Sequence, residues 1–218
     1  MPFSKQDRIA VIGAGLMGHG IAQIFAAHGY RVSLFDVNDE ALGRALENVR
    51  DNLTLLTANG IGKKEESEAV VGRISACRRL EEAIAGVRFV VEAVVELLEV
   101  KQQLFQELDG LCGPDTILAT NTSVISITEI AAKARNRERI VGTHFWNPPY
   151  LIPLVEVVPG QETSLQVVDR TYDLLQSLGK HPVRVKKDVP GFVGNRLQHA
   201  LWREAISIVD QGIADAAT

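Results

Sequence analysis

Residues 8–36 read RIAVIGAGLMGHGIAQIFAAHGYRVSLFD, and this stretch decides the fold. The apolar run Ile9–Ile12 predicts a buried parallel strand, and a second apolar run, Val32–Phe35, ends directly before Asp36. Between the two runs the spacing G-x-G-x-x-G opens a predicted helix, with glycines at Gly13, Gly15 and Gly18. A strand, a glycine turn, a helix, a second strand and an acidic residue in this order predict a dinucleotide-binding βαβ unit.

The three glycines and the acidic residue suit a dinucleotide for separate physical reasons. Gly13 allows the tight turn, Gly15 lets the backbone approach the pyrophosphate, and Gly18 lets helix and strand pack closely. The pyrophosphate would lie at the helix N-terminus, where free N–H groups and the helix dipole favour negative charge. The Asp36 carboxylate would accept hydrogen bonds from the adenosine ribose and repel a 2′-phosphate, and Val37–Asn38 supplies no arginine to hold that phosphate. The pattern therefore favours NAD over NADP.

The composition is that of an ordinary globular α/β protein. The chain has 218 residues and a formal net charge of -4, and it has no Lys/Arg cluster that would indicate a nucleic-acid partner. Cys77 and Cys112 have neither zinc-site spacing nor a disulfide framework, so no metal site is predicted and a reducing compartment is expected. No signal peptide and no apolar stretch of membrane-spanning length is visible. We therefore expect a cytoplasmic protein without a membrane partner.

Strand and helix patterns continue to alternate after Asp36. Further strands are expected at 74–76, 89–91, 116–120, 139–143, 153–158 and 182–185, and further helices at 98–112, 126–135 and 165–178. Two helices joined by a polar turn at 60–68 are expected to form an arm that projects from the domain. These patterns predict an α/β fold, Rossmann-like and doubly wound, with a mostly parallel sheet and a helical arm.

Two of the predicted helices carry apolar stripes, which we expect to face the sheet. The stripe of the helix at 98–112 is formed by Val100, Leu104, Leu108 and Leu111. The stripe of the helix that ends before Gly179 is formed by Leu165, Val168, Tyr172, Leu175 and Leu178.

The last part of the chain differs from what precedes it. Pro190–Gly191 interrupts the pattern, and Phe192–Gln211 then predicts a single helix that is apolar on more than one side. Such a helix is normally covered by neighbours, which the remaining residues do not supply. We therefore divide the chain into a nucleotide-binding domain, 1–189, and a segment, 190–218, that is covered by a partner chain or continued in a longer protein.

Polar side chains that could perform chemistry follow the later strands or lie within them. His144, at a predicted strand end, can take a proton from a substrate hydroxyl near neutral pH, although a histidine bonded to the backbone is the simpler interpretation. Glu156 lies in the apolar strand LVEVV, where it is expected either to pair with a histidine or to face solvent at the sheet edge. Ser123 follows the predicted strand at 116–120, and Asn195 lies in the first turn of the last predicted helix; each could contact a ligand or cap a helix. The other histidines have no companion pattern and are expected on the surface or in loops: His19 (at most beside the cofactor), His28, His181 and His199.

Taken together, the motifs resemble the 3-hydroxyacyl-CoA dehydrogenase family over nearly the whole chain. The matching segments are GAGLMG at 13–18, VEAVVE at 91–96, NTS at 121–123, HFWNP at 144–148, LVEV at 154–157 and PGFVGNR at 190–196. Several separate motifs in the family's order are far more specific than any one of them.

The resemblance implies a reversible, NAD-dependent oxidation of an L-3-hydroxyacyl-CoA to the 3-ketoacyl-CoA. The family's catalytic histidine and its carboxylate partner match His144 and Glu156, and its substrate-contacting residues match Ser123 and Asn195. The family's NAD contacts match Gly13, Ala14, Gly15, Leu16, Met17, Gly18, Asp36, Glu96, Lys101, Ser123 and Asn147. Residues 190–218 match the first helix of the family's helical C-terminal domain, which forms a homodimer.

Two departures from the family pattern keep other functions open. The segment NPPYLIP at 147–153 lacks the methionine–lysine pair typical of acyl-CoA members, and it resembles gulonate (lambda-crystallin) and carnitine dehydrogenases, which oxidise small free 3-hydroxy acids. Lys63 and Lys64 could meet CoA phosphates, but a solvated charged turn explains them more simply. Because only the first helix of the C-terminal domain is present, a non-catalytic NAD-binding protein is the third hypothesis.

Overall fold

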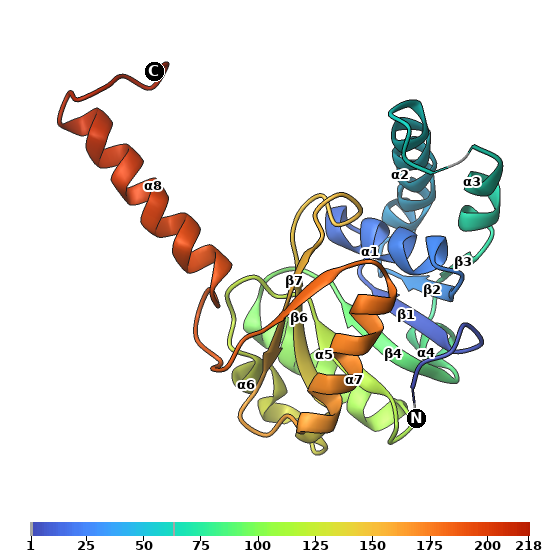
Figure 1. Ribbon diagram of the computed structural model, residues 1–218. Helices are drawn as coiled ribbons and strands as arrows, with labels where there is room; N and C mark the ends of the chain where they lie inside the picture. Colours follow the sequence, from blue (N-terminus) through green and yellow to red (C-terminus); the bar gives the residue numbers. More distant parts are fainter. Residues whose placement is uncertain (1, 63) are drawn as a thin grey trace.

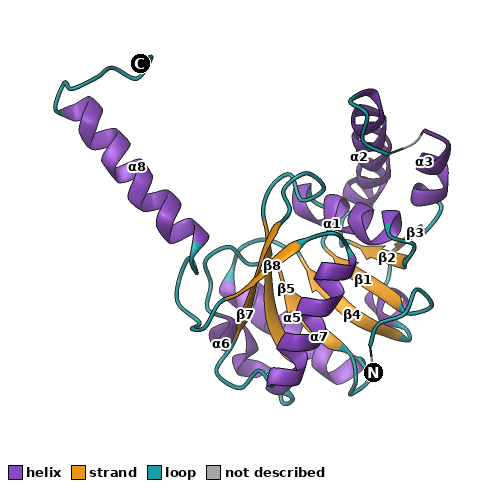
Figure 2. Cartoon of the chain, viewed as in Figure 1, coloured by secondary structure: helices purple, strands orange, loops and turns teal. Residues whose placement is uncertain are grey.

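Eight strands form one sheet in the computed structural model, which describes residues 2–62 and 64–218 (Figures 1 and 2). The strands are β1 Arg8–Ile12, β2 Arg31–Phe35, β3 Ile74–Cys77, β4 Val87–Glu92, β5 Ile117–Thr120, β6 Ile140–Phe145, β7 Leu154–Pro159 and β8 His181–Arg184. Their order in the sheet is β3-β2-β1-β4-β5-β6-β7-β8. The first six of these strands run parallel, while β7 and β8 run the opposite way. The predicted Rossmann-like, mostly parallel sheet is therefore confirmed.

Helices connect the strands as the alternating pattern predicts. They are α1 Leu16–Ala27, α2 Asp39–Ala58, α3 Lys64–Val71, α4 Leu80–Ile84, α5 Leu98–Leu111, α6 Ile127–Ile130, α7 Leu165–Ser177 and α8 Gly194–Asp210, with short 3₁₀ helices at Ala131–Lys133 and Arg137–Arg139. The short helix α4 was not predicted from the sequence. Among the described residues no helix is long and apolar enough to cross a bilayer.

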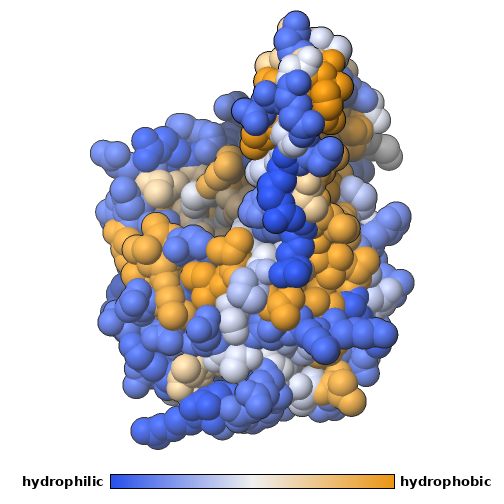
Figure 3. Space-filling view, turned by 90° about the vertical axis from the view of Figure 1, so that its left-hand side faces the viewer, coloured by the Kyte–Doolittle hydropathy of each residue, from blue (hydrophilic) through white to orange (hydrophobic). Residues whose placement is uncertain are grey.

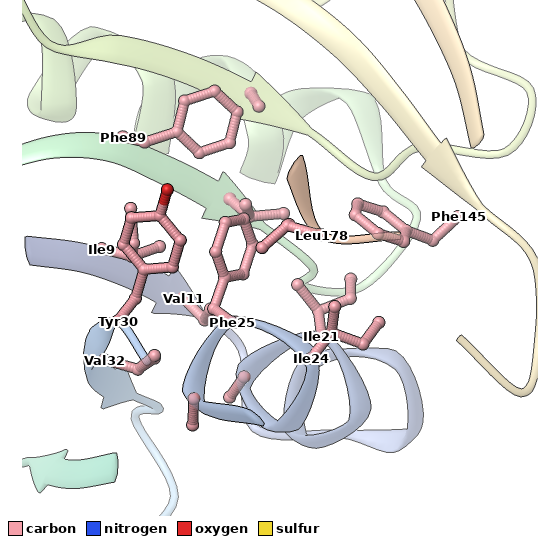
Figure 4. Close-up of a cluster of buried hydrophobic side chains, with 14 of the residues drawn as sticks. Ile9, Val11, Ile21, Ile24, Phe25, Tyr30, Val32, Phe89, Phe145 and Leu178 are labelled. Carbon is pink, nitrogen blue, oxygen red and sulfur yellow. The ribbon is translucent and has the colours of Figure 1, made fainter. Parts of the chain in front are cut away.

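The sheet is buried between two helical layers, because successive residues of a strand point to opposite faces. Ile9 and Val11 of β1 pack with α1, α2 and α7, whereas Ala10 and Ile12 pack with α4, α5 and α6. On the first face, the rings of Phe25 and Tyr30 meet edge to face with centroids 5.9 Å apart (Figure 4). Since β1 has β2 on one side and β4 on the other, the chain reverses its winding direction at the carboxyl end of β1.

Both predicted apolar stripes are only partly correct. In α5, Val100 and Leu111 are 39% and 50% exposed, and the buried face instead includes Lys101 and Asp109. In α7, Leu165 is 81% exposed, and Val167, Thr171 and Leu174 join the buried face that was predicted for Val168, Leu175 and Leu178. A hydrophobic pattern assigns only apolar residues to a buried face, whereas α5 also buries charged side chains, which oppositely charged residues from other elements neutralise.

The helical arm is built from α2 and α3, which stand up from the sheet (Figure 1). Asn38 caps α2, because its Oδ1 accepts hydrogen bonds from the N–H groups of Glu40 and Ala41 at 2.9 and 3.3 Å. The polar turn is shorter than predicted, since α3 already begins at Lys64. Lys63 lies outside the described residues, and so does the side chain of Lys64, so the structure does not test their suggested contact with CoA phosphates.

Helix α8 projects away from the rest of the molecule and carries the C-terminal end of the chain (Figure 1). It begins at Gly194, two residues later than predicted, because Phe192 has a positive φ of 48° and packs in the core at 1% exposure. None of the residues of α8 is buried, and Leu201 and Ile206 are 69% and 68% exposed. Seen from the side of α8, hydrophobic and hydrophilic areas alternate on the surface (Figure 3). Within the described residues, the apolar side chains of this helix are therefore not covered.

Candidate active site

The glycine turn after β1 has the backbone geometry that close approach of a phosphate requires. Gly13 has a φ of 102°, which side chains other than glycine rarely adopt, and a Cβ there would lie 2.5 Å from the carbonyl oxygen of Ala93. A Cβ on Gly18 would overlap the carbonyl group of Gly13, so α1 packs tightly against the turn. Among the described residues, apart from its chain neighbours, no atom lies within 4 Å of the Cβ position of Gly15, the N-cap residue of α1, and no side chain makes a capping hydrogen bond to this helix. The helix N-terminus therefore has open space in front of it.

A pocket of about 600 Å³ opens over this turn, at the carboxyl ends of the parallel strands. Val100 and Leu104 of the predicted α5 stripe line this pocket, which explains the partial exposure of Val100. The lining is formed by Ile12, Gly13, Gly15, Leu16, Met17, Phe35, Asp36, Val37, Ala93, Val94, Val95, Glu96, Val100, Leu104, Asn121 and Ser123.

Asp36 is fixed at the β2 end of the pocket by two backbone groups. Its Oδ2 accepts a hydrogen bond from the Ala14 N–H at 2.7 Å, and its Oδ1 accepts one from the Asn38 N–H at 2.9 Å. The carboxylate thus bridges the glycine turn and the start of α2, and it lines the pocket where a ribose would be recognised.

A buried ion pair lies beneath the other end of the pocket. Glu92, the last residue of β4, is 0% exposed, and its Oε1 lies 2.6 Å from the Nζ of Lys101 in α5. The Thr120 hydroxyl donates to the other carboxylate oxygen of Glu92 at 2.6 Å. Lys101 is itself only 1% exposed, and its ammonium lies 3.2 Å from the Oε2 of Glu96.

Glu96 connects the buried ion pair to the loop after β5, because it contacts both Lys101 and residues of this loop. Its Oε1 accepts hydrogen bonds from the Thr122 hydroxyl and from the N–H of Ser123, the latter at 2.9 Å. Burial disfavours the charged carboxylate, but the Thr122 bond, the charge of Lys101 and the Ser123 bond outweigh it and lower the pKa of Glu96. Glu96 therefore stays ionised and holds Ser123 at the rim of the pocket.

His144 and Glu156 form the pair that the sequence offered as one of two possibilities. The two residues lie opposite each other on the antiparallel strands β6 and β7, and His144 Nδ1 is 2.8 Å from Glu156 Oε2. Both side chains are almost fully buried. His144 lies within β6, which extends to Phe145, so the predicted end of this strand at residue 143 was two residues short.

The second oxygen of Glu156 is bound to the beginning of α8. Glu156 Oε1 accepts hydrogen bonds from the N–H groups of Val193 and Gly194, each at 3.0 Å. Burial opposes ionisation, but the bonds to His144 and to these two N–H groups outweigh it and lower the pKa of Glu156. The next residue, Asn195, donates from its side-chain amide to the Ser123 carbonyl oxygen at 2.9 Å.

These contacts connect the four residues that are predicted to be catalytic, partly through backbone groups. His144 pairs with Glu156, Glu156 binds the backbone of Gly194, and Asn195 reaches Ser123, which lines the pocket. Asn147 lies two residues beyond β6 and is exposed. Lys101 lies below the pocket rather than in its lining, with its ammonium between two carboxylates.

Comparison with known proteins gives the family. Residues 8–189 match the family described as "3-hydroxyacyl-CoA dehydrogenase, NAD binding domain". The chain belongs to the 3-hydroxyacyl-CoA dehydrogenase family. NAD, the cofactor that the sequence predicts, is the one named in the description of this family.

Three relatives illustrate the range of this family. A "3-hydroxyadipyl-CoA dehydrogenase" of Escherichia coli is 42% identical over 206 residues, 94% of this chain and 43% of the relative. A "5-formyl-3-hydroxy-2-methylpyridine 4-carboxylate 5-dehydrogenase" of Mesorhizobium japonicum is 42% identical over 207 residues, 95% of this chain and 66% of the relative. The crystal structure of 3-hydroxybutyryl-CoA dehydrogenase from E. coli matches with a TM-score of 0.90 and 41% identity, over 96% of this chain and 44% of that one. The chain thus spans less than two thirds of the length of these relatives.

The geometry fits NAD, and it makes the cofactor preference testable at Asp36. We expect Asp36→Asn to weaken NAD binding about 10-fold or more, because a charged hydrogen-bond acceptor for the ribose is lost, and to raise the NADP-to-NAD affinity ratio, because the repelling charge is lost. Dissociation constants for both nucleotides, from fluorescence or calorimetry, measure this. The matched control is Asp39→Asn, an exposed residue three positions on, which should leave both constants unchanged. An unaltered affinity ratio in Asp36→Asn would contradict the assignment.

Some residues that shape the site were missed or misplaced by the sequence analysis. The sequence pattern assigns no role to Glu92 or to Asp188, although the Asp188 carboxylate holds the start of α6 through Ser126 and Thr128. His19 was expected on the surface or in a loop, but it lies in α1 at 6% exposure, with Nδ1 2.8 Å from the Gly15 carbonyl oxygen. Each of these roles depends on a partner from another element of the fold or on the helix's own backbone, which single-residue patterns do not reveal.

Proposed function

We propose that the whole protein oxidises an L-3-hydroxyacyl-CoA to the 3-ketoacyl-CoA with NAD⁺, reversibly. The observation that carries this proposal is the buried His144–Glu156 pair, which lies at the same carboxyl edge of the sheet as the nucleotide pocket. A base oriented by a carboxylate beside a dinucleotide site suits the removal of a hydroxyl proton during hydride transfer.

The contact between His144 and Glu156 indicates which ring nitrogen of His144 accepts the substrate proton. Because Nδ1 of His144 faces Glu156, it carries the ring proton of the neutral imidazole, and Nε2 is the nitrogen left for the substrate hydroxyl. His144 takes the hydroxyl proton on Nε2 as the carbonyl forms, and Glu156 stabilises the resulting imidazolium. When bound, NAD⁺ would supply the acceptor for the hydride that leaves C3. In the reverse direction His144 returns the proton to the carbonyl oxygen.

The other predicted site residues receive supporting roles in this proposal. Ser123 and Asn195 hold the substrate near the reacting carbon, and the hydrogen bond from the Asn195 side-chain amide to the Ser123 carbonyl oxygen supports this, because it keeps the two residues close together. Glu96 and Asn147 contact the cofactor, and Lys101 acts through Glu96, which it neutralises from below. The glycine turn from Gly13 to Gly18 and Asp36 hold the two ends of the adenosine diphosphate part.

Helix α8 is the first helix of a further helical domain in this proposal, and 190–218 belongs to that domain. The support is the exposure of its apolar residues together with the greater length of the relatives. A homodimer formed through that domain would cover these side chains.

A second candidate function keeps the chemistry but changes the substrate to a small free 3-hydroxy acid. The segment 147–153 supports it, because Pro149 and Tyr150 pack against Gly20 of α1 and the segment lacks the methionine–lysine pair of acyl-CoA members. One relative is named for a pyridine carboxylate rather than for a CoA ester.

NADH formation distinguishes the candidates. We expect the full-length protein to form NADH at 340 nm with L-3-hydroxybutyryl-CoA and to show a kcat/KM at least about 10-fold lower with free 3-hydroxybutyrate, gulonate or carnitine, because those acids lack the binding energy of the CoA moiety. A higher kcat/KM with a free acid would replace the first candidate by the second. NAD binding without NADH from any substrate would support the non-catalytic alternative.

A further inference from the structure

The two carboxylate oxygens of Glu156 bind different partners: one binds the imidazole of His144, and the other binds the backbone at the beginning of α8. Oε2 of Glu156 lies 2.8 Å from His144 Nδ1, while Oε1 accepts from the N–H groups of Val193 and Gly194 at 3.0 Å each. A carboxylate held through both oxygens has little freedom to rotate. The orientation that Glu156 offers to the histidine is therefore fixed by the position of the first turn of α8.

Two aromatic rings that contact His144 also help to position the first turn of α8. The ring of Phe192, which precedes the helix, has its centroid 5.7 Å from that of His144, and the ring of Trp146 has its centroid 5.1 Å away. Gly194 packs directly on the Trp146 ring: a Cβ there would overlap Cζ2 and lie 3.1 Å from Cη2. Only glycine at residue 194 lets the backbone come close enough for its N–H to reach Glu156.

Residues 188–195 lead into α8, and side chains at both ends of this segment form hydrogen bonds with the loop after β5 and the start of α6. Asp188 accepts from the Ser126 hydroxyl at 2.6 Å and from the Thr128 N–H at 2.7 Å, and Asn195 donates to the Ser123 carbonyl oxygen at 2.9 Å. The rest of α8 projects without buried residues, so its docking to the described part of the chain depends on this first turn.

We infer that the start of α8 is a positioning element for the base, in which Gly194 and Val193 act through Glu156 to keep His144 in the Nδ1–H tautomer. The inference rests on the proposed function for its kinetic consequence but not for its structural one. When the two N–H groups leave Oε1, Glu156 can turn, and the neutral imidazole is no longer held with Nε2 free to accept a proton. Helix α8, which belongs to the segment beyond the nucleotide-binding domain, thereby controls the competence of the base.

The test is Gly194→Ala in the full-length protein, with Trp146→Phe as its partner variant. The added Cβ must push the first turn away from the Trp146 ring, and phenylalanine at 146 removes Cζ2 and Cη2, the two ring atoms that would lie nearest to this Cβ. The matched control is Gly43→Ala, another helical glycine, whose Cβ would meet nothing within 4 Å. Thermal unfolding verifies that every variant is folded.

Two measurements decide the inference. Ring ¹⁵N shifts of His144, recorded without substrate, should show the Nδ1–H tautomer in the unaltered protein and in Gly43→Ala, and a mixture with the Nε2–H tautomer in Gly194→Ala. With substrate, Gly194→Ala should lower kcat about 10- to 100-fold with the KM for NAD unchanged, as expected for a misplaced catalytic group. Adding Trp146→Phe to Gly194→Ala should restore the tautomer and most of kcat.

An unchanged tautomer and kcat in folded Gly194→Ala would overturn the inference, and so would a loss that the double variant does not reverse. Failure of the proposed function looks different, because the unaltered protein would then show no turnover while the tautomer still responded to Gly194→Ala.

Discussion

His144→Gln is expected to lower kcat about 10²- to 10⁴-fold while leaving the affinity for NAD unchanged. The loss is large because, in the proposed function, His144 is the base for the substrate hydroxyl, and Glu156 holds its Nδ1 so that Nε2 can accept the proton. NAD affinity should persist because the pocket lining is formed by other residues, from the glycine turn and from the ends of β2, β4 and β5. Steady-state kinetics with L-3-hydroxybutyryl-CoA and calorimetric NAD titration measure the two effects separately.

The control for this prediction is His181→Gln, on an exposed residue of β8, which should leave kcat within a factor of two or so of the unaltered protein. Glutamine removes the basic nitrogen but keeps a polar side chain of similar length opposite Glu156. A kcat for His144→Gln equal to that of the control would refute the assignment of the base. A parallel loss of NAD affinity would instead indicate that His144 supports the fold of the pocket.

The cofactor half of the site was predictable because its determinants are local in sequence. The turn at Gly13, the helix behind it and the acid at Asp36 lie within one βαβ unit, and the structure keeps their order and spacing. The direction of β3 to β6 followed from their alternation with helices, which places their carboxyl ends at one edge, whereas β7 follows β6 without a helix and runs the opposite way. The link between His144 and Glu156 was foreseen as one of two possibilities, because an unpaired carboxylate in an apolar strand is unfavourable.

The parts that the sequence did not reveal depend on contacts between residues far apart in the chain. Lys101 and Asp109 occupy the buried face of α5, where a hydrophobicity pattern predicts apolar side chains. They are tolerated there because Glu92 from β4 neutralises Lys101 and Arg139 neutralises Asp109, at 2.6 and 2.7 Å. Similarly, Glu156 can bind both His144 and the start of α8 only if the backbone at residues 193 and 194 lies close to it, and the sequence pattern does not specify that position.

Because the Glu92–Lys101 pair is fully buried, removing one partner is expected to have the largest effect on stability. Lys101→Met should lower the free energy of unfolding by about 3–5 kcal/mol, since it leaves the Glu92 carboxylate buried without its counter-charge. Chemical denaturation monitored by circular dichroism measures this loss. The control is Lys133→Met, on an exposed lysine, which should change the free energy of unfolding by no more than about 0.5 kcal/mol.

The pH dependence of this loss identifies its cause. Burial raises the pKa of Glu92, and Lys101 is the main opposing influence, so the pKa should rise further in Lys101→Met. A carboxyl group with a higher pKa in the folded than in the unfolded state binds its proton more tightly when folded, so it supports stability at low pH and loses that support as pH rises. The destabilisation by Lys101→Met should therefore be smaller at pH 5 than at pH 8. The double variant Glu92→Gln/Lys101→Met should recover part of the stability and lose this pH dependence. If Lys101→Met instead lowers the free energy of unfolding equally at both pH values, then packing of the lysine stem, and not its charge, stabilises the fold.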